Sequence, residues 1–413
     1  MTMHNSSQPY AVNGDRLWSD LMELGSLGAA SGGGISRPGL SQADEEARQW
    51  FIAACEKAEL EVRVDAMRNV IARIPAQDPN ARVLATGSHL DTVLNGGRFD
   101  GALGVLAGLE CARIIKENAL SLPYAFEVMA FTDEEGAYGA GSVGSRAMIG
   151  SLKPGELDRV SSITGRSFAA DLAKIGGDAS VDVRRSPDGF AYYLELHIEQ
   201  GPILEQAGKD CGPVTAIVGI ERYDVTVTGQ AGHAGTTPMH MRKDALVMAA
   251  PLFTLLPQWA HEQNPEMVCT IGVLFLLPGG ANIIPGVCRF TVGVRSARQE
   301  DLDAVGQRLM DYVDGNPAFS MKQIYKKPGV TMHPEAVAAI EKAIAMTGYS
   351  HMPLPSGAGH DAQSMAPYVP TGMIFIPCRD GLSHNPNEWA DKDQVTKGTQ
   401  VLLNAFLALS GKV

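Results

Sequence analysis

The segment RVLATGSHLDTVLNGGRFDGALGVLAGLECARIIKEN, residues 82–118, contains a short apolar run, a glycine-rich polar loop and a longer apolar run in succession. The first run predicts a buried strand over 82–88, and the second predicts a helix over 102–118 because its apolar residues recur at helical spacing. A strand that leads into a helix is typical of α/β folds with a parallel sheet. The loop between them holds His89 and Asp100 where glycines let the backbone bend.

The same alternation of strands and helices extends over the first half of the chain. Further strands are predicted over 60–66, 124–132 and 190–198, and further helices over 14–28 and 41–58. From about residue 214 the order becomes strand, helix, strand, strand, helix and strand, predicted over 221–229, 242–263, 267–277, 286–296, 298–315 and 319–327. That order is typical of a ferredoxin-like unit. We therefore predict an α/β fold in which residues 1–213 and 330–413 form a domain with a mainly parallel sheet, and residues 214–329 form an inserted ferredoxin-like (βαββαβ) domain.

The composition limits the possible partners and the compartment. The chain has 413 residues and a net charge of −12 at pH 7, so it has no general attraction to nucleic-acid phosphates. We predict neither a membrane span nor secretion, because the chain has no run of 18 or more apolar residues and its first residues lack the apolar core of a signal peptide. The six cysteines are scattered and form no CxxC pair, which predicts reduced thiols in a cytoplasmic protein.

Residue types that bind metals occur in four separate segments, each after a predicted strand or in a glycine-rich loop. They are His89 and Asp100 in the opening segment, Asp133, Glu134 and Glu135 in FTDEEGAYG, His197 in ELHIEQG, and His384 in GLSHNPNE. In open α/β sheets, function concentrates at the carboxyl ends of the strands, where these residues should meet. Adjacent buried carboxylates repel each other unless a cation lies among them, and carboxylates with imidazoles suit Zn, Mn, Co or Ni. The four segments together predict a metal centre, although each one alone is more typical of a polar loop, a surface acidic pair or a turn.

Three shorter matches are set aside. GAGSVG, residues 139–144, fits the GxGxxG pattern of dinucleotide sites, but acidic residues stand where phosphates would approach and no helix clearly begins at its first glycine. HIE at 197–199 fits the HxE of zinc deaminases, but the required PCxxC is absent. Ser142 does not lie in GxSxG, since Ala140 occupies the first glycine position.

Seven motifs resemble, in their order along the chain, those of one enzyme family, and the similarity runs from about residue 20 to the C-terminus. They are GSHLDTVLNGGRFDG, TDEEG, ELHIEQGP, GQAGHAGTTPM, GGANIIPG, SGAGHDA and SHNPNE. The sequence resembles the M20-type binuclear metallohydrolases, and within them the amidase/hydantoinase/carbamoylase branch of N-carbamoyl-L-amino acid hydrolases, β-ureidopropionases and allantoate amidohydrolases. HLDT and EEG mark the superfamily, whereas HIEQG, GHAGTTPM and GGANIIPG are more specific to the branch.

The resemblance implies a role for each matching position in the metal centre. It implies two divalent metal ions per subunit, with His89 and His197 on the first, Glu135 and His384 on the second, and Asp100 bridging both. It implies that Glu134 is the general base and that Asp91 orients His89 through the other ring nitrogen. It also implies a cis peptide bond after Asp100.

The resemblance further implies where a small-molecule substrate binds. Arg295 would bind a substrate carboxylate bidentately, His233 would stabilise the oxyanion, and Gln200 and Asn282 would contact the carboxylate or the ureido group. The loop that would line the site contains Gly357, Ala358, Gly359, His360 and Asp361, of which His360 could equally be structural. The inserted domain would act as a lid and would form a homodimer, in which the partner subunit could contribute some of these residues.

On this basis we expect a hydrolase that cleaves the ureido C–N bond of an N-carbamoyl-L-amino acid. Hydrolysis of allantoate or ureidoglycolate and β-ureidopropionase activity are alternatives, while HIEQG and GGANIIPG argue against an M20 exopeptidase or aminoacylase. Two positions depart from the family's pattern. Gly293 stands where many relatives have an acidic residue two before the arginine, and Ala137-Tyr138-Gly139 stands where many have Arg-Phe after EEG. Neither position is an implied metal ligand, so the departures bear on substrate shape rather than on the metal centre.

Overall fold

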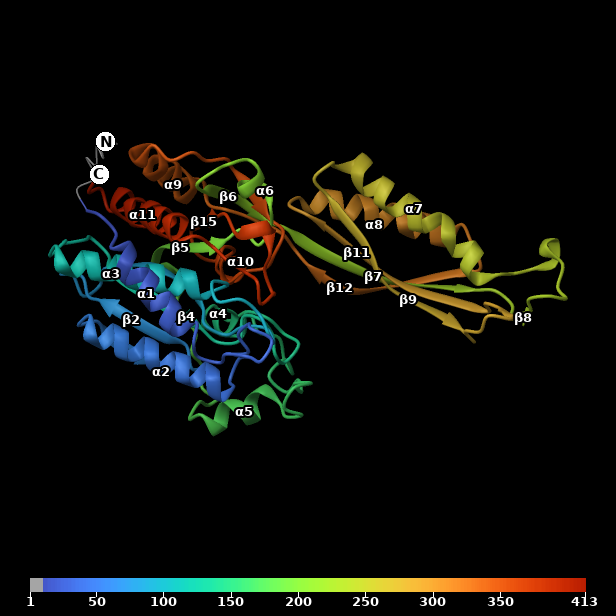
Figure 1. The fold of residues 1–413 in the computed structure, drawn as a ribbon, viewed down its shortest axis with the longest axis horizontal. Helices are drawn as coiled ribbons and strands as arrows, with labels where there is room; N and C mark the ends of the chain where they lie inside the picture. The colour runs from blue at the N-terminus through green and yellow to red at the C-terminus, as the bar shows by residue number, and fades with distance from the viewer. Residues whose placement is uncertain (1–9) are drawn as a thin grey trace. The chain divides into compact units, whose positions relative to one another are not determined.

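The computed structural model describes residues 10–413, which form two compact units (Figure 1). Unit 1 contains the described residues up to Thr215 together with Met332–Val413, and unit 2 contains Ala216–Thr331. The predicted insert, 214–329, begins and ends two residues earlier than unit 2. Within the described part of the chain, no helix has the length and apolar character needed to cross a membrane.

Unit 1 is built on a mixed sheet. The strands of this sheet are β1 (Glu61–Val64), β2 (Val70–Ile74), β3 (Val83–His89), β4 (Ala125–Phe131), β5 (Phe190–Ile198), β6 (Gly212–Ile217), β13 (Val330–Thr331), β14 (Leu354–Ser356) and β15 (Thr371–Ile376). They lie in the order β1-β2-β4-β3-β5-β15-β6-β13, and β14 pairs with β6. The central strands β4, β3, β5 and β15 run parallel to one another, whereas the flanking pairs are antiparallel. The predicted largely parallel central sheet is therefore confirmed.

Unit 1 also contains nine α-helices within residues 10–413. They are α1 (Gly14–Leu24), α2 (Gln42–Lys57), α3 (Ala102–Glu117), α4 (Val143–Met148), α5 (Phe168–Lys174), α6 (Ile203–Gln206), α9 (Pro334–Thr347), α10 (Asp361–Met365) and α11 (Lys392–Leu409). The main hydrophobic core lies where α1, α3, α9 and α11 pack on one another and on the sheet, while α4 and α10 pack together. Every residue of β3 and β4 is buried, which explains why their sequences are mostly apolar or small instead of alternating, with His89 and Glu127 as the exceptions.

The parallel arrangement brings several polar residues to one edge of the sheet. His89 is the last residue of β3, and His197 is the second-last residue of β5. Residues 133–135 follow β4, and His384 follows β15. Asp100 lies in the loop between the end of β3 and the start of α3, which is at the same edge of the sheet. The fold therefore gathers segments that are nearly 300 positions apart in the sequence.

Unit 2 combines a four-stranded antiparallel sheet with two helices. Its main elements are β7 (Gly219–Thr228), α7 (Ala245–Gln263), β9 (Val268–Leu277), β11 (Val287–Ser296), α8 (Gln299–Asp314) and β12 (Phe319–Lys327). The sheet has the order β12-β7-β11-β9, and β8 (Gly232–His233) pairs separately with β10 (Ile283–Ile284). Buried and accessible residues alternate along β7 and β11, because α7 and α8 cover one face of the sheet around a separate core.

Candidate metal centre

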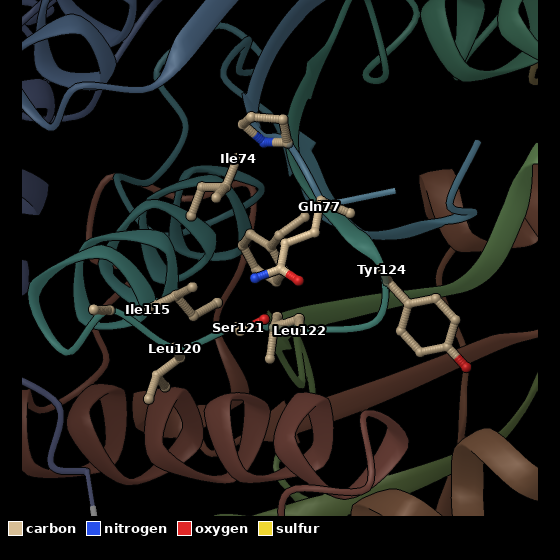
Figure 2. A pocket seen from close by; sticks show the side chains of 11 residues that line it. Ile74, Gln77, Ile115, Leu120, Ser121, Leu122 and Tyr124 are labelled. Carbon is tan, nitrogen blue, oxygen red and sulfur yellow. The ribbon is translucent and has the colours of Figure 1, made fainter. Parts of the chain in front are cut away.

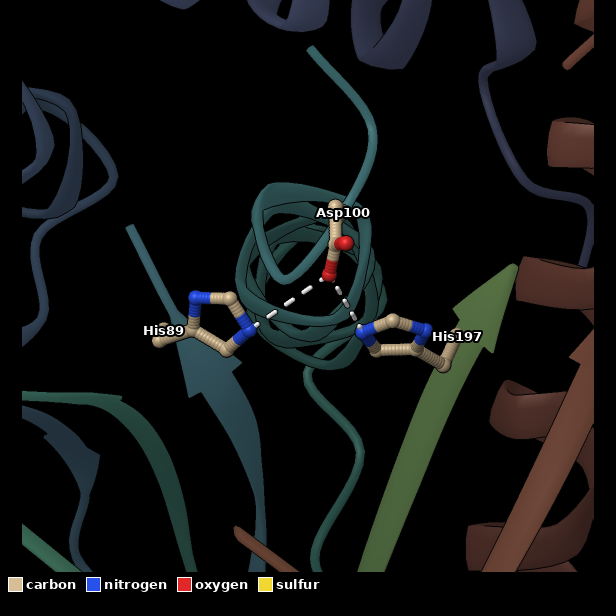
Figure 3. A group of neighbouring side chains, drawn as sticks. All are labelled: His89, Asp100 and His197. Atoms are coloured by element: carbon tan, nitrogen blue, oxygen red, sulfur yellow. Dashed lines mark ion pairs between the residues drawn. The ribbon is translucent and has the colours of Figure 1, made fainter. Parts of the chain in front are cut away.

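Asp100 lies at the middle of the predicted ligand group, and its two carboxylate oxygens face different histidines. Asp100 Oδ1 is 3.6 Å from His89 Nε2 and 3.2 Å from His197 Nε2 (Figure 3). Asp100 Oδ2 is 3.4 Å from His384 Nε2. Asp100, His89 and His197 are buried, whereas the side chain of His384 is 52% exposed. The site is therefore closed on the sheet side and accessible near His384.

The ligand-type atoms form two groups that share Asp100. The first group contains His89, Asp100 and His197, and the second contains Asp100, Glu135 and His384, with the atoms of each group within 4.8 Å of one another. Glu135 Oε2 is 3.2 Å from His384 Nε2. The other oxygen, Glu135 Oε1, is buried and has no hydrogen-bond partner within residues 10–413. A shared carboxylate between two three-residue groups is the donor arrangement that a pair of cations requires.

The histidine rings have the orientation of metal ligands. Nδ1 of His89 is 2.9 Å from the carbonyl oxygen of Asp91, and Nδ1 of His197 is 2.9 Å from the carbonyl oxygen of Ile198. A ring nitrogen beside a carbonyl oxygen must donate, so in a neutral ring the lone pair is on Nε2. Consistently, the backbone N–H of Gly101 donates to Nε2 of His197 at 3.1 Å. Both lone pairs therefore face a carboxylate, which is favourable only if a cation or a proton lies between them.

The carboxylates of the site favour the protonated forms of the nearby histidines. Burial disfavours the protonated ring of His89, but the carboxylates of Asp91, Glu134 and Asp100 outweigh it and raise the pKa of His89 well above its usual value. Hydrogen bonds to Asp100 and Glu135 raise the pKa of His384 to about 10.

The carboxylates respond in the corresponding way. Burial, with the nearby charge of Asp100, raises the pKa of Glu135 to about 7. Burial also acts to raise the pKa of Asp100, but hydrogen bonds to His197 and His384 lower it well below its usual value. Without metal ions, protons would have to supply the positive charge that these carboxylates require.

Asp91 lies beside the other ring nitrogen of His89, Nδ1. Its carboxylate Oδ1 is 3.7 Å from His89 Nδ1, and the hydrogen bond to that nitrogen is made instead by the Asp91 carbonyl oxygen. The carboxylate accepts the backbone N–H groups of Glu134, at 3.3 Å, and Glu135, at 3.1 Å. Asp91 thus orients His89 through its backbone carbonyl, which is closer to the ring than its carboxylate. The Asp91 side chain orients the loop after β4.

Glu134 is held by a residue that the sequence analysis set aside. Ser142 Oγ donates to Glu134 Oε1 at 2.9 Å, and the backbone N–H of Ser142 donates to the Glu134 carbonyl at 2.9 Å. Glu134 Oε2 is 3.9 Å from His89 Nε2, so this oxygen faces the first ligand group. Ser142 is buried with a positive φ of 54°. GAGSVG therefore closes the loop around the predicted base, and no pattern of sequence spacing would have indicated this contact.

Three polar residues surround Asp100, two of them from the loop that carries His384 and one, Gln200, from the segment after β5. Ser383 Oγ is 2.8 Å from Asp100 Oδ2, and Gln200 Nε2 donates to the same oxygen at 2.8 Å. Glu388 Oε1 accepts the backbone N–H groups of Phe99, at 2.9 Å, and Asp100, at 3.1 Å. Burial raises the pKa of Glu388 to about 7. The sequence analysis assigned no role to Ser383 or Glu388; the only signal was their position in the motif SHNPNE.

At two positions of the opening loop, any side chain larger than that of glycine would clash with a neighbouring residue. A Cβ at Gly101 would lie 2.4 Å from the His89 ring, and the φ of Gly101 is 67°. A Cβ at Gly97 would lie 1.9 Å from the Glu388 carboxyl carbon. The implied cis peptide after Asp100 is not observed, since the cis bond found within residues 10–413 is Leu277–Pro278. Glycine at 101 is explained by the positive φ and by the space that the His89 ring occupies.

His360 packs behind a predicted metal ligand. Its ring meets the His197 ring edge-on with centroids 4.5 Å apart, and its Nε2 is 2.8 Å from Ser356 Oγ. Ser356 Oγ also accepts the backbone N–H of Ala358 at 3.2 Å, which ties the 357–359 turn to the same place. Nearby, Glu195 accepts hydrogen bonds from Ser88, Tyr193 and the Ala362 backbone. Glu195, His197 and His360 form a third group of ligand-type atoms within 4.8 Å of one another, although Glu195 is already bound to these three partners.

The remaining predicted substrate residues belong to unit 2. His233 in β8 pairs with Ile283 in β10, and the carbonyl of Asn282 accepts the backbone N–H of Ala234 at 3.0 Å. The structure thus brings His233 and Asn282 side by side. The backbone N–H of Gly235 donates to His233 Nδ1 at 3.0 Å, so a neutral ring carries its proton on Nε2. Arg295 lies in β11 of the four-stranded sheet.

A separate apolar hollow in unit 1 is not the reactive site. It is lined mainly by Ile74, Gln77, Ile115, Leu120, Leu122 and Tyr124, with no charged side chain (Figure 2). Tyr124 precedes β4, whereas the predicted ligands follow β4, so the hollow lies at the opposite end of that strand. The predicted metal ligands lie at the other edge.

Comparison with known proteins identifies related chains. Residues 85–408 match the model of peptidase family M20/M25/M40. An N-carbamoyl-L-amino-acid amidohydrolase of Paenarthrobacter aurescens is 38% identical over 404 residues, which cover 96% of this chain and 98% of the relative. An allantoate amidohydrolase of Bacillus subtilis is 31% identical over 393 residues, 94% of this chain and 95% of the relative. The crystal structure of a hydantoinase/carbamoylase family amidase from Burkholderia multivorans matches with a TM-score of 0.91 at 36% identity, over 98% of this chain and 99% of that one.

Proposed function

The chain belongs to peptidase family M20/M25/M40, and we propose that it hydrolyses the ureido C–N bond of an N-carbamoyl-L-amino acid. The products would be the free amino acid, ammonia and carbon dioxide. The observation that carries the proposal is the convergence of two ligand groups on Asp100, with Glu134 beside them. The near full-length relative named N-carbamoyl-L-amino-acid amidohydrolase supports the choice of substrate class.

The metal centre would hold two divalent ions, drawn from Zn, Mn, Co and Ni. His89 and His197 would bind the first ion, Glu135 and His384 the second, and Asp100 both. The residues fit this role because both buried imidazoles direct Nε2 at Asp100 and because Glu135 Oε1 is buried without a partner among the described residues. When bound, such ions lower the pKa of water and polarise a carbonyl group.

The chain's own residues would carry the proton and stabilise the charge. Glu134 would accept a proton from the attacking water and pass it to the departing amide nitrogen, which leaves as ammonia. The carbamate that remains on the amino acid nitrogen then loses carbon dioxide. His233 would donate its Nε2 proton to the oxyanion, a role that the Gly235 hydrogen bond to Nδ1 supports.

The substrate would be held by the predicted binding residues. Arg295 would bind the α-carboxylate through its planar guanidinium, and Asn282 and Gln200 would contact the carboxylate or ureido group. Gly357, Ala358 and His360 would line the site, with His360 acting from behind His197. Gln200 already donates to Asp100, so it would bind substrate from beside the metal centre.

Unit 2 would be a ferredoxin-like lid through which two copies form a homodimer. Its βαββαβ order and its β12-β7-β11-β9 sheet support the fold assignment. β9 is an edge strand of this sheet, and Val273, Leu274, Phe275 and Leu277 on it are 42–61% exposed. An exposed apolar edge strand invites pairing with another strand, and a second copy would cover it. The six cysteines, all free, support the expected reducing, cytoplasmic location.

Allantoate hydrolysis is the second candidate, favoured by the Bacillus subtilis relative. The test is ammonia release by metal-replete protein from N-carbamoyl-L-amino acids, N-carbamoyl-β-alanine, allantoate and ureidoglycolate, with dipeptides scored by amino acid release. Turnover of N-carbamoyl-L-amino acids well above the others is expected. A preference for allantoate, ureidoglycolate or N-carbamoyl-β-alanine would reassign the substrate, and cleavage of dipeptides alone would overturn the ureido assignment.

A further inference from the structure

The four-stranded sheet of unit 2 has a polar face opposite its helices. Along β7 and β11 the buried residues, such as Tyr223 and Val294, belong to the core under α7 and α8. The alternate residues Arg222, Gly293 and Arg295 are accessible or partly accessible. Because successive residues of a strand point to opposite faces, these three share the face away from the helices.

The arginines on this face have different surroundings. Arg289 in β11 forms an ion pair with Asp224 in β7, and Thr291 donates to the same carboxylate at 2.7 Å. Arg222 forms no ion pair within residues 10–413; its guanidinium instead lies 5.0 Å from the centre of the Tyr325 ring. A guanidinium that rests on an aromatic face keeps its hydrogen-bond donors available at its edge.

Arg222 and Arg295 are close enough for their charges to interact. Arg295 is directly opposite Ile220, two positions before Arg222, so the two arginines are diagonal neighbours across β7 and β11. Burial and the charge of Arg222 both lower the pKa of Arg295. Two neighbouring cations raise each other's energy, and an anion bound beside them would relieve that repulsion.

The position opposite Arg222 carries no side chain that would occupy the space beside its guanidinium. Gly293 pairs with Arg222 on one side and with Thr270 on the other. A Cβ at Gly293 would find its nearest neighbours, Arg222 Cγ and the Thr270 carbonyl oxygen, only at 3.9 Å. The space between the strands on this face is therefore open next to Arg222, and the chain itself places no acidic side chain at 293.

We propose that Arg222 binds a second carboxylate of the substrate, so that the preferred N-carbamoyl amino acid has an acidic side chain. This rests on the proposed function, in which Arg295 binds the α-carboxylate. With its donors available and its neighbour Arg295 engaged by one carboxylate, Arg222 is placed to recognise a carboxylate a few bonds away in the same molecule. A short amino-dicarboxylic acid carrying an N-carbamoyl group has this geometry.

The test compares acids with their neutral isosteres. Initial rates of ammonia release by the metal-replete full chain are measured with N-carbamoyl-L-aspartate against the asparagine derivative, and N-carbamoyl-L-glutamate against the glutamine derivative. For one of these pairs, wild type should favour the acid in kcat/KM by at least about tenfold. Arg222→Gln should remove this preference while kcat/KM for the amide changes by no more than about threefold.

Substitutions at Gly293 provide an independent arm with matched controls. Gly293→Asp would place a carboxylate opposite Arg222 and should also abolish the preference, whereas Gly293→Asn should retain it. Arg289→Gln, on the same face but at an arginine already paired with Asp224, should leave the preference unchanged.

Two results would overturn the inference while leaving the proposed function intact. One is a wild-type enzyme that turns over the neutral derivatives as well as or better than the acids. The other is an Arg222→Gln enzyme that loses acid and amide activity equally, which would mean that both arginines share one carboxylate. Absence of turnover for every ureido compound would instead overturn the proposed function, and the inference with it.

Discussion

Removal of the Ser142 hydroxyl tests whether the loop after β4 positions the base. Ser142 Oγ donates to Glu134 Oε1 at 2.9 Å, and both groups are shielded from water. In Ser142→Ala the carboxylate loses this donor and is free to rotate away from the His89 side of the site. The backbone hydrogen bond from Ser142 to the Glu134 carbonyl remains, so the loop itself should keep its conformation.

The expected magnitude follows from the kind of hydrogen bond. A hydrogen bond to a charged group contributes about 1.5–3 kcal/mol. If that amount is lost from the transition state, kcat should fall by about ten- to a hundredfold, since about 1.4 kcal/mol corresponds to tenfold. KM and metal content should stay close to wild type, because Ser142 contacts none of the proposed metal ligands. This split between kcat and KM distinguishes positioning of the base from general damage to the site.

Ser142→Gly is the matched control for the backbone. The φ of Ser142 is 54°, a conformation that costs other residues about 1–2 kcal/mol relative to glycine. Ser142→Gly should therefore unfold at higher urea concentration than Ser142→Ala, while both lose the same factor in kcat. The reasoning is refuted if Ser142→Ala retains wild-type kcat on an N-carbamoyl-L-amino acid, or if its activity falls only in proportion to lost metal.

Three further outcomes are expected. Glu134→Gln should keep both metal ions by elemental analysis yet lose at least about 10²–10⁴-fold in kcat; near-normal turnover would exclude Glu134 as the base. Gly101→Ala would force a Cβ to within 2.4 Å of the His89 ring at a φ of 67°. The variant should therefore lose about 1–3 kcal/mol of unfolding free energy in urea titrations and bind less metal. Full metal occupancy at wild-type stability would contradict the proposed geometry. The pKa of His384 is raised to about 10 and that of Glu135 to about 7, so the metal-free site holds protons at pH 7 that a metal ion must displace. Calorimetric titrations should therefore show that metal binding releases protons and that metal affinity weakens as pH falls. Metal binding that does not depend on pH would contradict this assignment.

The local patterns of the sequence were sufficient for the central strands β3, β4 and β5 and for the ligand residue types, but not for β2, β6, β13, β14 or β15. The run over β3 and the helical spacing over α3 predicted their type because burial imposes continuous apolar character on a central strand. His89, Asp100, Glu135, His197 and His384 were recognised as metal-ligand types after strands, and parallel strands necessarily bring such ends to one edge.

Other roles could not be predicted from spacing because they depend on contacts between distant segments. Asp91 was expected to orient His89 through the other ring nitrogen, but the spacing did not reveal that its carbonyl oxygen makes this contact while its carboxylate binds the backbone of residues 134–135. Ser142 was dismissed with a nucleotide-type pattern, and its contact with Glu134 arises only when the loop folds back. Glu388 lies 288 positions from Asp100, whose backbone N–H it accepts.

The sequence by itself determined which residues have the chemistry of the site, since imidazole, carboxylate and guanidinium groups are properties of residue types and the apolar periodicity specifies the elements that carry them. Only the tertiary structure decided how each group is used: that Asp100 faces two ligand groups with different oxygens, that His360 packs behind His197, and that Arg222 lies beside Arg295 and opposite a glycine. The physical reason is that hydrogen bonds and charge interactions depend on distances of a few ångströms, and those distances are set by strand register and loop closure between segments far apart in the chain.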